Sequence, residues 1–399
     1  MTCPQVSSAI LMDNGTLHDM TQDFPPEVMA KILTLICGME VLIPTPNSYP
    51  WIIGYVCSRW RQILWHTPEI WNKITIGYRS SSILTTPPKE YTVGDILKHI
   101  LSNTTGPMSL VVTEAGHMNY GNMWDIILDN FGRFVDLSMD PVPQHTLTSI
   151  FNLPPSAFSR LESLLLFTTD FNGSFPELST SPLQSAPNLR CVNYEIPSLN
   201  YVPSLLLLPW ATIKVIDVKR MHIPPDVIFH IFRSSPSLES CRFLIDSTQE
   251  IPDTHGIILP FVEELVLFTQ KSFDWNGFFR QITTPSLQCL ILQSPHVPCL
   301  PVTSLILRSR CPMAKLDIFG QGSAGHHNGG DGDVESLLDN LPSLKRLIVP
   351  WSIPPSIFGK IYKGDFPKLA LASFFVRPDR FGAFLDMMDL YIASPPKHR

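Results

Sequence analysis

The sequence predicts an α/β protein in which a small helical module precedes a long strand–helix repeat. Two observations lead to this prediction. Nine segments of the second half carry apolar residues at the same three positions, at intervals near 25 residues. Closer to the N-terminus, apolar residues recur instead at the spacing of amphipathic helices.

The helical module covers Asp23 to Trp71. Pro25 and Pro26 suit the first turn of its first helix, and Glu27 suits the positive end of the helix dipole. One face of this helix carries the apolar residues Val28, Ile32, Leu35 and Ile36.

A second helix is expected after a proline-rich break that ends at Pro50. Its apolar stripe consists of Val56, Trp60, Ile63 and Leu64, while Arg59 and Arg61 are expected to face solvent. A Thr-Pro-Glu cap at 67–69 predicts a third, short helix that ends at Trp71.

The repeat consists of nine six-residue segments whose first, fourth and sixth residues are all apolar. They begin at Leu161, Leu189, Ile213, Leu238, Val262, Leu287, Met313, Leu344 and Leu369. Successive starts lie 24 to 31 residues apart, and the longest interval contains a glycine-rich run at 320–333, interpreted as a flexible insertion. Prolines that mark a turn precede five segments, at Pro187, Pro236, Pro285, Pro342 and Pro367. Each segment is therefore predicted to be a strand.

Helices are predicted between strands. Pro225 to Ser234 and Asp333 to Asn340 each carry one apolar stripe, formed by Val227, Ile228, Ile231 and Phe232 and by Val334, Leu337 and Leu338. Alternating strands and helices predict a parallel sheet on one side of a curved array. Over 134–375 the chain resembles the leucine-rich-repeat family, which implies a solenoid. The ninth position of each repeat lacks the family's usual asparagine or cysteine, so an irregular solenoid is expected.

The particular residues of the helical module indicate a family more specifically than its pattern of helices does. Phe-Pro-Pro-Glu-Val, then Val-Cys-x-x-Trp-Arg-x-Ile, then Thr-Pro-x-Ile-Trp resembles the F-box motif, particularly the F-box-like families of fungi. The resemblance implies docking on the Skp adaptor of a cullin-based ubiquitin ligase, with the repeats selecting a substrate. The adaptor-facing positions would be Phe24, Pro25, Glu27, Val28, Ile32, Leu33, Val56, Cys57 and Trp60. In the alternative interpretation the same residues form a helical domain that caps the open end of the repeat.

The concave face of the repeat is the expected substrate-binding surface. Strand residues alternate between faces, so the third, fifth and seventh positions should lie on it. An apolar patch rimmed by two charges is expected there, formed by Val266, Phe268, Ile291 and Phe319 with Arg242 and Asp317. Alternatively, an inserted loop or the C-terminal segment 377–399 covers this patch.

The sequence carries only incomplete versions of catalytic and cofactor-binding motifs. Gly320 to Gly325 spells GxGxxG, but the helix that a dinucleotide site needs can hardly begin before Asp333. The run also contains part of a calcium-binding repeat, with Val334 in place of a ligand, and His326 and His327 are expected to be solvated. We therefore expect no enzyme activity, no cofactor and no metal. A hydrolase or nucleotide-binding enzyme remains the less favoured alternative.

The composition limits which other classes of protein the sequence could represent. Among 399 residues, 44% are hydrophobic and only 16% are charged, with a net charge of −6 that does not suit nucleic acid. The 8 cysteines form no CxxC pair and no zinc-type cluster, so reduced thiols in the cytoplasm or nucleus are expected. No signal peptide or membrane helix is predicted.

The predicted organisation has five parts: an N-terminal tail (1–20), the F-box-like domain (21–73), a connecting region with the first strand–helix units (74–133), the repeat solenoid (134–380) and a C-terminal tail (381–399). The predicted function is that of a non-enzymatic substrate receptor in a Skp–cullin–F-box ligase, whose partners are the adaptor and an unknown protein target. An interaction scaffold without a ligase role is the main alternative.

Overall fold

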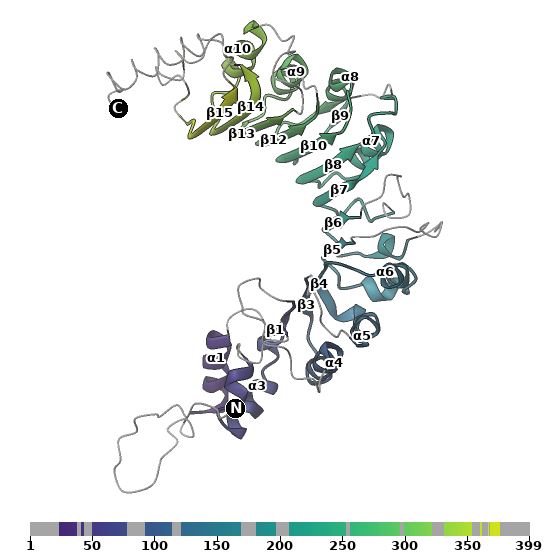
Figure 1. Cartoon of the computed structure of the whole chain (residues 1–399), viewed down its shortest axis with the longest axis vertical. Helices are drawn as coiled ribbons and strands as arrows, with labels where there is room; N and C mark the ends of the chain where they lie inside the picture. The colour runs from purple at the N-terminus through teal and green to yellow at the C-terminus, as the bar shows by residue number, and fades with distance from the viewer. Residues whose placement is uncertain are drawn as a thin grey trace, which may run out of the picture. The chain divides into compact units, whose positions relative to one another are not determined.

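The computed structural model describes residues 24–37, 41–43, 50–77, 92–113, 121–168, 181–196, 207–252, 256–295, 299–320, 331–352, 360, 366 and 368–375. The chain divides into two compact units between Arg133 and Phe134. We call them unit 1 and unit 2 and describe each by itself (Figure 1).

Unit 1 begins with the helical module and continues into strands and helices. Its described elements are α1 (Pro26–Cys37), β1 (Val41–Ile43), α2 (Trp51–Gly54), α3 (Ser58–Trp65), the 3-10 helix η2 (Pro68–Ile70), β2 (Lys73–Ile76), α4 (Val93–Asn103), β3 (Met108–Val112), α5 (Met123–Asp129) and η3 (Phe131–Arg133). The strands β1, β2 and β3 pair in parallel. α1, α3 and η2 occupy the places of the three predicted helices, with α2 as an additional short turn of helix. α3 begins only at Ser58, so Val56 of the predicted apolar stripe lies before it, and η2 is a 3-10 helix that ends at Ile70.

Unit 2 is α/β, with a large parallel sheet and helices, as predicted. Its described elements are β4 (Phe134–Met139), α6 (Gln144–Phe151), η4 (Pro155–Phe158), β5 (Ser163–Phe167), η5 (Pro182–Ser185), β6 (Cys191–Glu195), β7 (Val215–Ile223), α7 (Pro225–Ser234), β8 (Ser240–Ile245), β9 (Ile257–Ile258), β10 (Glu264–Thr269), α8 (Trp275–Arg280), β11 (Ile282–Thr283), β12 (Cys289–Gln293), α9 (Cys299–Ser309), β13 (Lys315–Phe319), α10 (Asp331–Asp339), β14 (Arg346–Ser352) and β15 (Leu371–Phe375).

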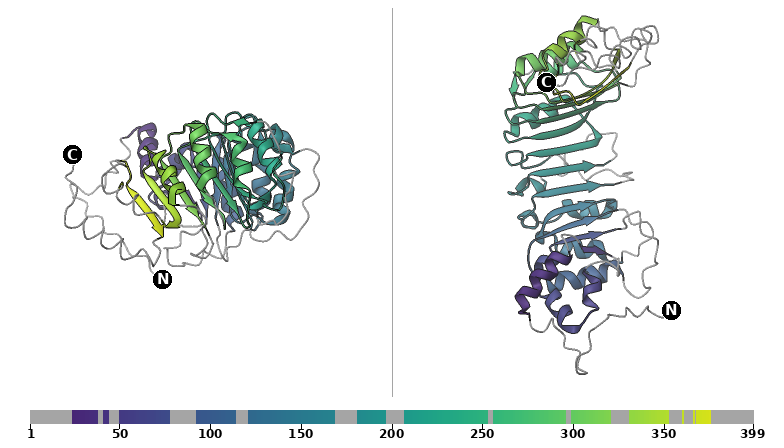
Figure 2. Two further views of the ribbon diagram at one scale, coloured as in Figure 1. Left: turned by 90° about the horizontal axis from the view of Figure 1, so that it is seen from above. Right: turned by 90° about the vertical axis from the view of Figure 1, so that its left-hand side faces the viewer.

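The nine predicted segments set the register of this sheet. Each one begins a strand at its third residue, and every strand pairs in parallel with the next, third position against third position, from Ser163 opposite Cys191 to Arg346 opposite Leu371. Figure 2 shows these strands side by side. In the first eight segments the residues at positions one, four and six are all buried. The ninth differs, because Ala372 at its fourth position is exposed.

The turn before each strand explains why the repeat is so regular. In four segments the first residue of the segment donates its N–H group to the carbonyl of the residue just before the proline. The donors are Leu189, Leu238, Leu287 and Leu344, and their acceptors are the carbonyls of Ala186, Ser235, Thr284 and Leu341. The prolines lie directly after these carbonyl residues, at the second place of the turn, where a fixed φ is favourable. Pro367 lies outside the described residues.

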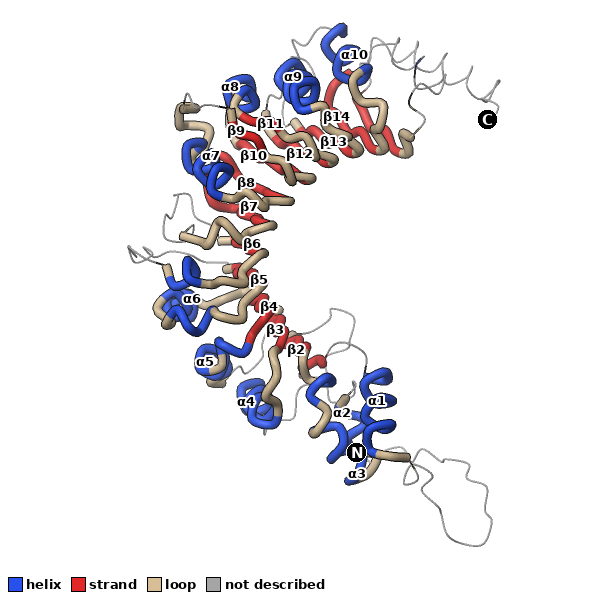
Figure 3. Tube along the Cα trace, turned by 180° about the vertical axis from the view of Figure 1, so that it is seen from behind, coloured by secondary structure: helices blue, strands red, loops and turns tan. Residues whose placement is uncertain are grey.

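Helices α6 to α10 lie on one side of the unit 2 sheet (Figures 1 and 3). They cover the face that carries positions four and six; for example, the ring of Phe232 in α7 lies 6.0 Å from that of Phe243 at position six of β8. α7 has the predicted bounds, whereas α10 begins at Asp331 and not at Asp333. The opposite face, which we call the open face, carries no helix within the described ranges. The segment 377–399 and the GxGxxG and histidine residues of 321–330 lie outside those ranges.

Candidate functional site

The two long helices of the module, α1 and α3, are fastened to each other by polar contacts. Arg59 Nη2 donates a hydrogen bond of 2.6 Å to the carbonyl of Phe24, just before α1. Cys57 is the N-cap of α3, and its Sγ accepts from the N–H of Trp60. A shallow groove of about 390 Å³ runs between the helices, lined by Glu27 and Ala30 on one side and by Gln62 and Ile63 on the other. The hydrogen bond of Arg59 therefore ties the start of α1 to α3.

The core beneath the helices is aromatic. The indole rings of Trp65 and Trp71 stack at 4.3 Å, and Trp51 packs edge-on against both. Trp71 is fully buried, and its Nε1–H donates a hydrogen bond of 2.9 Å to the carbonyl of Leu64. Trp60 is half-buried, so it belongs partly to this core and partly to the surface.

Many apolar side chains of the module remain outside that core. On α1 the buried residues are Met29, Leu33 and Cys37. The neighbouring face, predicted from the sequence to be apolar, is turned outward, and Leu35 is 76% exposed. Within the described residues, the module holds seven of the thirteen large hydrophobic side chains that are exposed: Phe24, Val28, Leu35, Ile36, Ile52, Tyr55 and Val56. We call these seven residues the apolar surface of the module.

The predicted adaptor-facing residues fall into three groups. Exposed side chains are those of Phe24, Pro25, Glu27, Val28 and Val56, and half-buried ones are those of Ile32, Cys57 and Trp60. Leu33 is 0% exposed and packs inward, so its assignment as a contact residue was wrong. Four exposed residues lay outside the predicted set, namely Leu35, Ile36, Ile52 and Tyr55. A signal for two of them was available, because Ile52, Tyr55 and Val56 have the i, i+3, i+4 spacing of one helical face.

The open face of unit 2 carries positions three, five and seven, as the strand alternation predicted. The expected apolar patch is nevertheless broken. Val266 is only 1% exposed, since it lies between Arg242 and Ile291 on the adjacent strands, and Asp317 is only 2% exposed. Phe268 and Ile291 are half-buried, while Phe319 is exposed.

Both charged groups predicted for the rim are held by ion pairs. Asp317 Oδ1 accepts from Arg346 Nε at 3.0 Å, and its Oδ2 lies 3.5 Å from Lys315 Nζ. Arg242 Nη1 lies 3.0 Å from Asp217 Oδ2. Asp317 therefore acts as a buried tie between β13 and β14, and it is not available as a rim charge.

A polar strip crosses β6, β7 and β8 at position five. Asn193, Asp217 and Arg242 lie opposite one another in the register, and each has a buried polar side-chain atom without a hydrogen-bond partner in the described structure. Burial raises the pKa of Asp217 above its ordinary value, although the neighbouring charges of Arg242 and Lys219 oppose this shift. The strip is therefore a partly desolvated polar surface.

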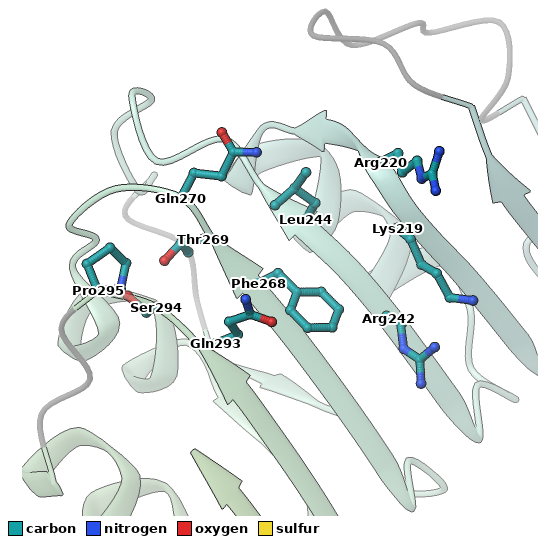
Figure 4. A pocket seen from close by; sticks show the side chains of 10 residues that line it. All are labelled: Lys219, Arg220, Arg242, Leu244, Phe268, Thr269, Gln270, Gln293, Ser294 and Pro295. Carbon is teal, nitrogen blue, oxygen red and sulfur yellow. The ribbon is translucent and has the colours of Figure 1, made fainter. Parts of the chain in front are cut away.

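A pocket of about 610 Å³ opens beside this strip, at the C-terminal ends of β7, β8, β10 and β12. Figure 4 shows the basic side chains of Lys219, Arg220 and Arg242 on one side of Phe268 and the amide of Gln293 on the other. Of these pocket residues, the predicted substrate-binding set included only Arg242 and Phe268.

A bulge in β7 lies at the pocket and contains two of its basic residues. The pairing of β7 with β8 passes from Val218 opposite Phe243 to His222 opposite Leu244. Three residues of β7, 219–221, therefore have no counterpart on β8. Lys219, at position seven, lies on the open face by strand alternation, and Arg220 follows it inside the bulge; both line the pocket.

Other kinds of site find no support in the described part of the chain. Within it, no group of three or more His, Cys, Asp or Glu side chains could hold a metal ion. The described cysteines, 37, 57, 191, 241, 289, 299 and 311, are free thiols. None of the described helices combines the length and the apolar character needed to cross a membrane.

The sequence was also compared with known proteins. No model of a protein family matches the chain, and no curated protein is significantly similar to it.

Proposed function

We propose that this chain is a substrate receptor of the F-box type, in which the helical module docks a Skp-type adaptor and the repeats, as an irregular leucine-rich-repeat solenoid, bind a protein target. One observation carries the proposal. The module has a complete aromatic core of its own and still leaves seven large apolar side chains in solvent. A concentration of exposed large apolar residues in one small domain is typical of a protein-binding surface.

The chemistry of such a receptor needs no catalytic group of its own. A ligase core bound to the module and a target bound to the repeats would share one complex, and the effective concentration of the target would rise accordingly. The motif wording, from Phe24 to Trp71, supports the adaptor as the partner of the module.

The proposal is tested by co-expression of the full chain with a Skp-type adaptor, followed by gel filtration. We expect the wild-type chain and the adaptor to co-elute. The variant Val28→Asp/Val56→Asp should lose co-elution, because it introduces two charges into the apolar surface while leaving the tryptophan core untouched. Both positions are exposed, so the variant should keep its folded state.

A matched control comes from unit 2. Ile258 and Phe261 are also exposed, at 68% and 58%, and lie outside the module. The variant Ile258→Asp/Phe261→Asp should co-elute as the wild type does. Failure of the folded wild-type chain to bind the adaptor would overturn the ligase role and favour an interaction scaffold.

A further inference from the structure

The charged side chains that line the pocket at the bulge of β7 are all positive. Its lining includes three cationic side chains, Lys219, Arg220 and Arg242, and no carboxylate. The partners of these cations lie outside the lining: Asp217 pairs with Lys219 and Arg242, and Glu195 pairs with Arg220 at 3.2 Å. In each pair the cation is the more exposed member. The opening therefore presents positive charge to solvent, although the chain as a whole carries −6.

The rest of the pocket is apolar or uncharged. Phe268 contributes a half-buried ring at its centre, and the amides of Gln270 and Gln293 lie at the edge. Thr269 lines the pocket as well, and its Oγ1 is buried without a hydrogen-bond partner in the described structure.

The spacing of these groups limits what can bind. Lys219 is on β7 and Phe268 is on β10, two strands away through β8. Neighbouring strands lie about 4.8 Å apart, so the two side chains are separated by about 10 Å across the sheet. An extended peptide advances about 3.3 Å per residue and covers that distance in about three residues.

We propose that this pocket binds an extended acidic segment of a partner protein, in which a carboxylate side chain lies about three residues from an aromatic or aliphatic one. The carboxylate pairs with Lys219 and Arg220, and the apolar side chain packs on Phe268. Backbone groups of the segment hydrogen-bond to Gln270 and Gln293. A nucleic acid fits less well, because its binding draws on a broad basic surface and the chain carries a net charge of −6.

This inference deepens the proposed function, since it names the chemistry of the target that the repeats would select. It does not depend on the adaptor. Peptide binding without adaptor binding would support the peptide site and overturn the ligase role. Adaptor binding without peptide binding would support the ligase role and overturn the peptide site.

The test is selection of peptides by the folded full chain. A random heptapeptide library displayed on phage is panned against the immobilised protein, and the peptide with the strongest enrichment is labelled with fluorescein for anisotropy titrations. We expect enriched peptides to carry aspartate or glutamate about three positions from an apolar residue. The variant Lys219→Gln/Arg220→Gln should weaken binding about tenfold, through the loss of two partly exposed ion pairs. Phe268→Ser should also weaken it.

The matched control is Arg280→Gln, which removes an exposed arginine at the end of α8, outside the pocket. It should bind as the wild type does. Thermal unfolding of each variant verifies that it is folded, and Arg220→Glu provides a second charge variant at the most exposed of the three cations. Selection of basic or uncharged peptides, no selection above background, or equal binding by the Lys219/Arg220 variant would overturn the inference. So would a single-stranded oligonucleotide that binds in a manner sensitive to Lys219 and Arg220 but not to Phe268.

Discussion

The helical module of unit 1 and the sheet of unit 2 treat their apolar side chains in opposite ways. The module packs a few tryptophans together in its core and leaves aliphatic residues such as Leu35 exposed to solvent. The sheet buries every residue at positions one, four and six of its first eight segments and offers an open face on which polar and apolar side chains are mixed. A surface of the first kind suits a partner that buries it on binding, whereas a surface of the second kind suits selection among partners by charge and shape.

The largest effect is expected in the core of unit 2. Phe243 is fully buried at position six of β8, so Phe243→Ala leaves a cavity and should lower the free energy of unfolding by about 3–5 kcal/mol. Urea denaturation followed by circular dichroism measures the change. Phe261→Ala, at a residue that is largely exposed, is the control and should change the free energy by less than about 0.5 kcal/mol. Equal effects of the two variants would contradict the contrast between core and surface.

The core of the module should respond next. Trp71→Phe keeps an aromatic ring in place but removes the donor to the carbonyl of Leu64. Because that carbonyl still accepts from the backbone N–H of Thr67 at 3.3 Å, we expect a loss of about 0.5–1.5 kcal/mol. Near-ultraviolet circular dichroism during thermal unfolding reports on the tryptophan cluster itself. A larger loss in Trp71→Ala than in Trp71→Phe would separate ring packing from the hydrogen bond, and no loss in either variant would rule out the cluster as the core.

A smaller, pH-dependent effect is expected on the open face. Because burial raises the pKa of Asp217 above the unfolded value of 3.8, the folded protein holds this proton more tightly than the unfolded chain does. Ionisation of Asp217 therefore lowers stability as the pH rises from about 4 through the folded pKa. Asp217→Asn lacks this effect, so its free energy of unfolding relative to wild type should increase over that interval. A relative decrease, measured by urea denaturation at several pH values, would mean that Arg242 and Lys219 outweigh burial.

The smallest effect is expected on the apolar surface of the module. Leu35 and Tyr55 are 76% and 72% exposed, so Leu35→Ser and Tyr55→Ser should each change stability by less than about 0.5 kcal/mol. The measurement is thermal unfolding of the isolated full chain. A loss comparable to that of Trp71→Phe would show that these residues support the fold, and the module would then lose its main feature as a docking surface.

The regular part of unit 2 could be predicted from the sequence because its signal is repeated and redundant. Positions one, four and six give the strand frame, the prolines give the turns, and α7 follows from its own apolar stripe. If one segment were aligned wrongly, its apolar positions would disagree with those of the neighbouring segments, so the repeat itself reveals the error.

The open face and the module could not be predicted to the same depth. Burial of Val266 depends on the size of Arg242 and Ile291 on the adjacent strands, which alternation along one strand does not reveal. The bulge of β7 leaves no trace in the spacing either, since the interval from Ile213 to Leu238 is 25 residues, like those around it. In α1, both Met29 with Leu33 and Val28 with Ile32 have the i, i+4 spacing, and periodicity alone does not say which pair faces inward.

The bulge of β7 also bears on how such a protein can change over time. Pairing resumes in register at His222 and Ile223, so the three residues 219–221 are an addition that the neighbouring strands accommodate. An in-frame loss of three codons would remove Lys219 and Arg220 and leave a continuous strand from Val218 to His222. A comparable gain elsewhere in the sheet could place new charges on another part of the open face. The repeat can thus acquire or discard a recognition element in a single genetic event, which in β7 would also remove one buried side chain, that of Met221.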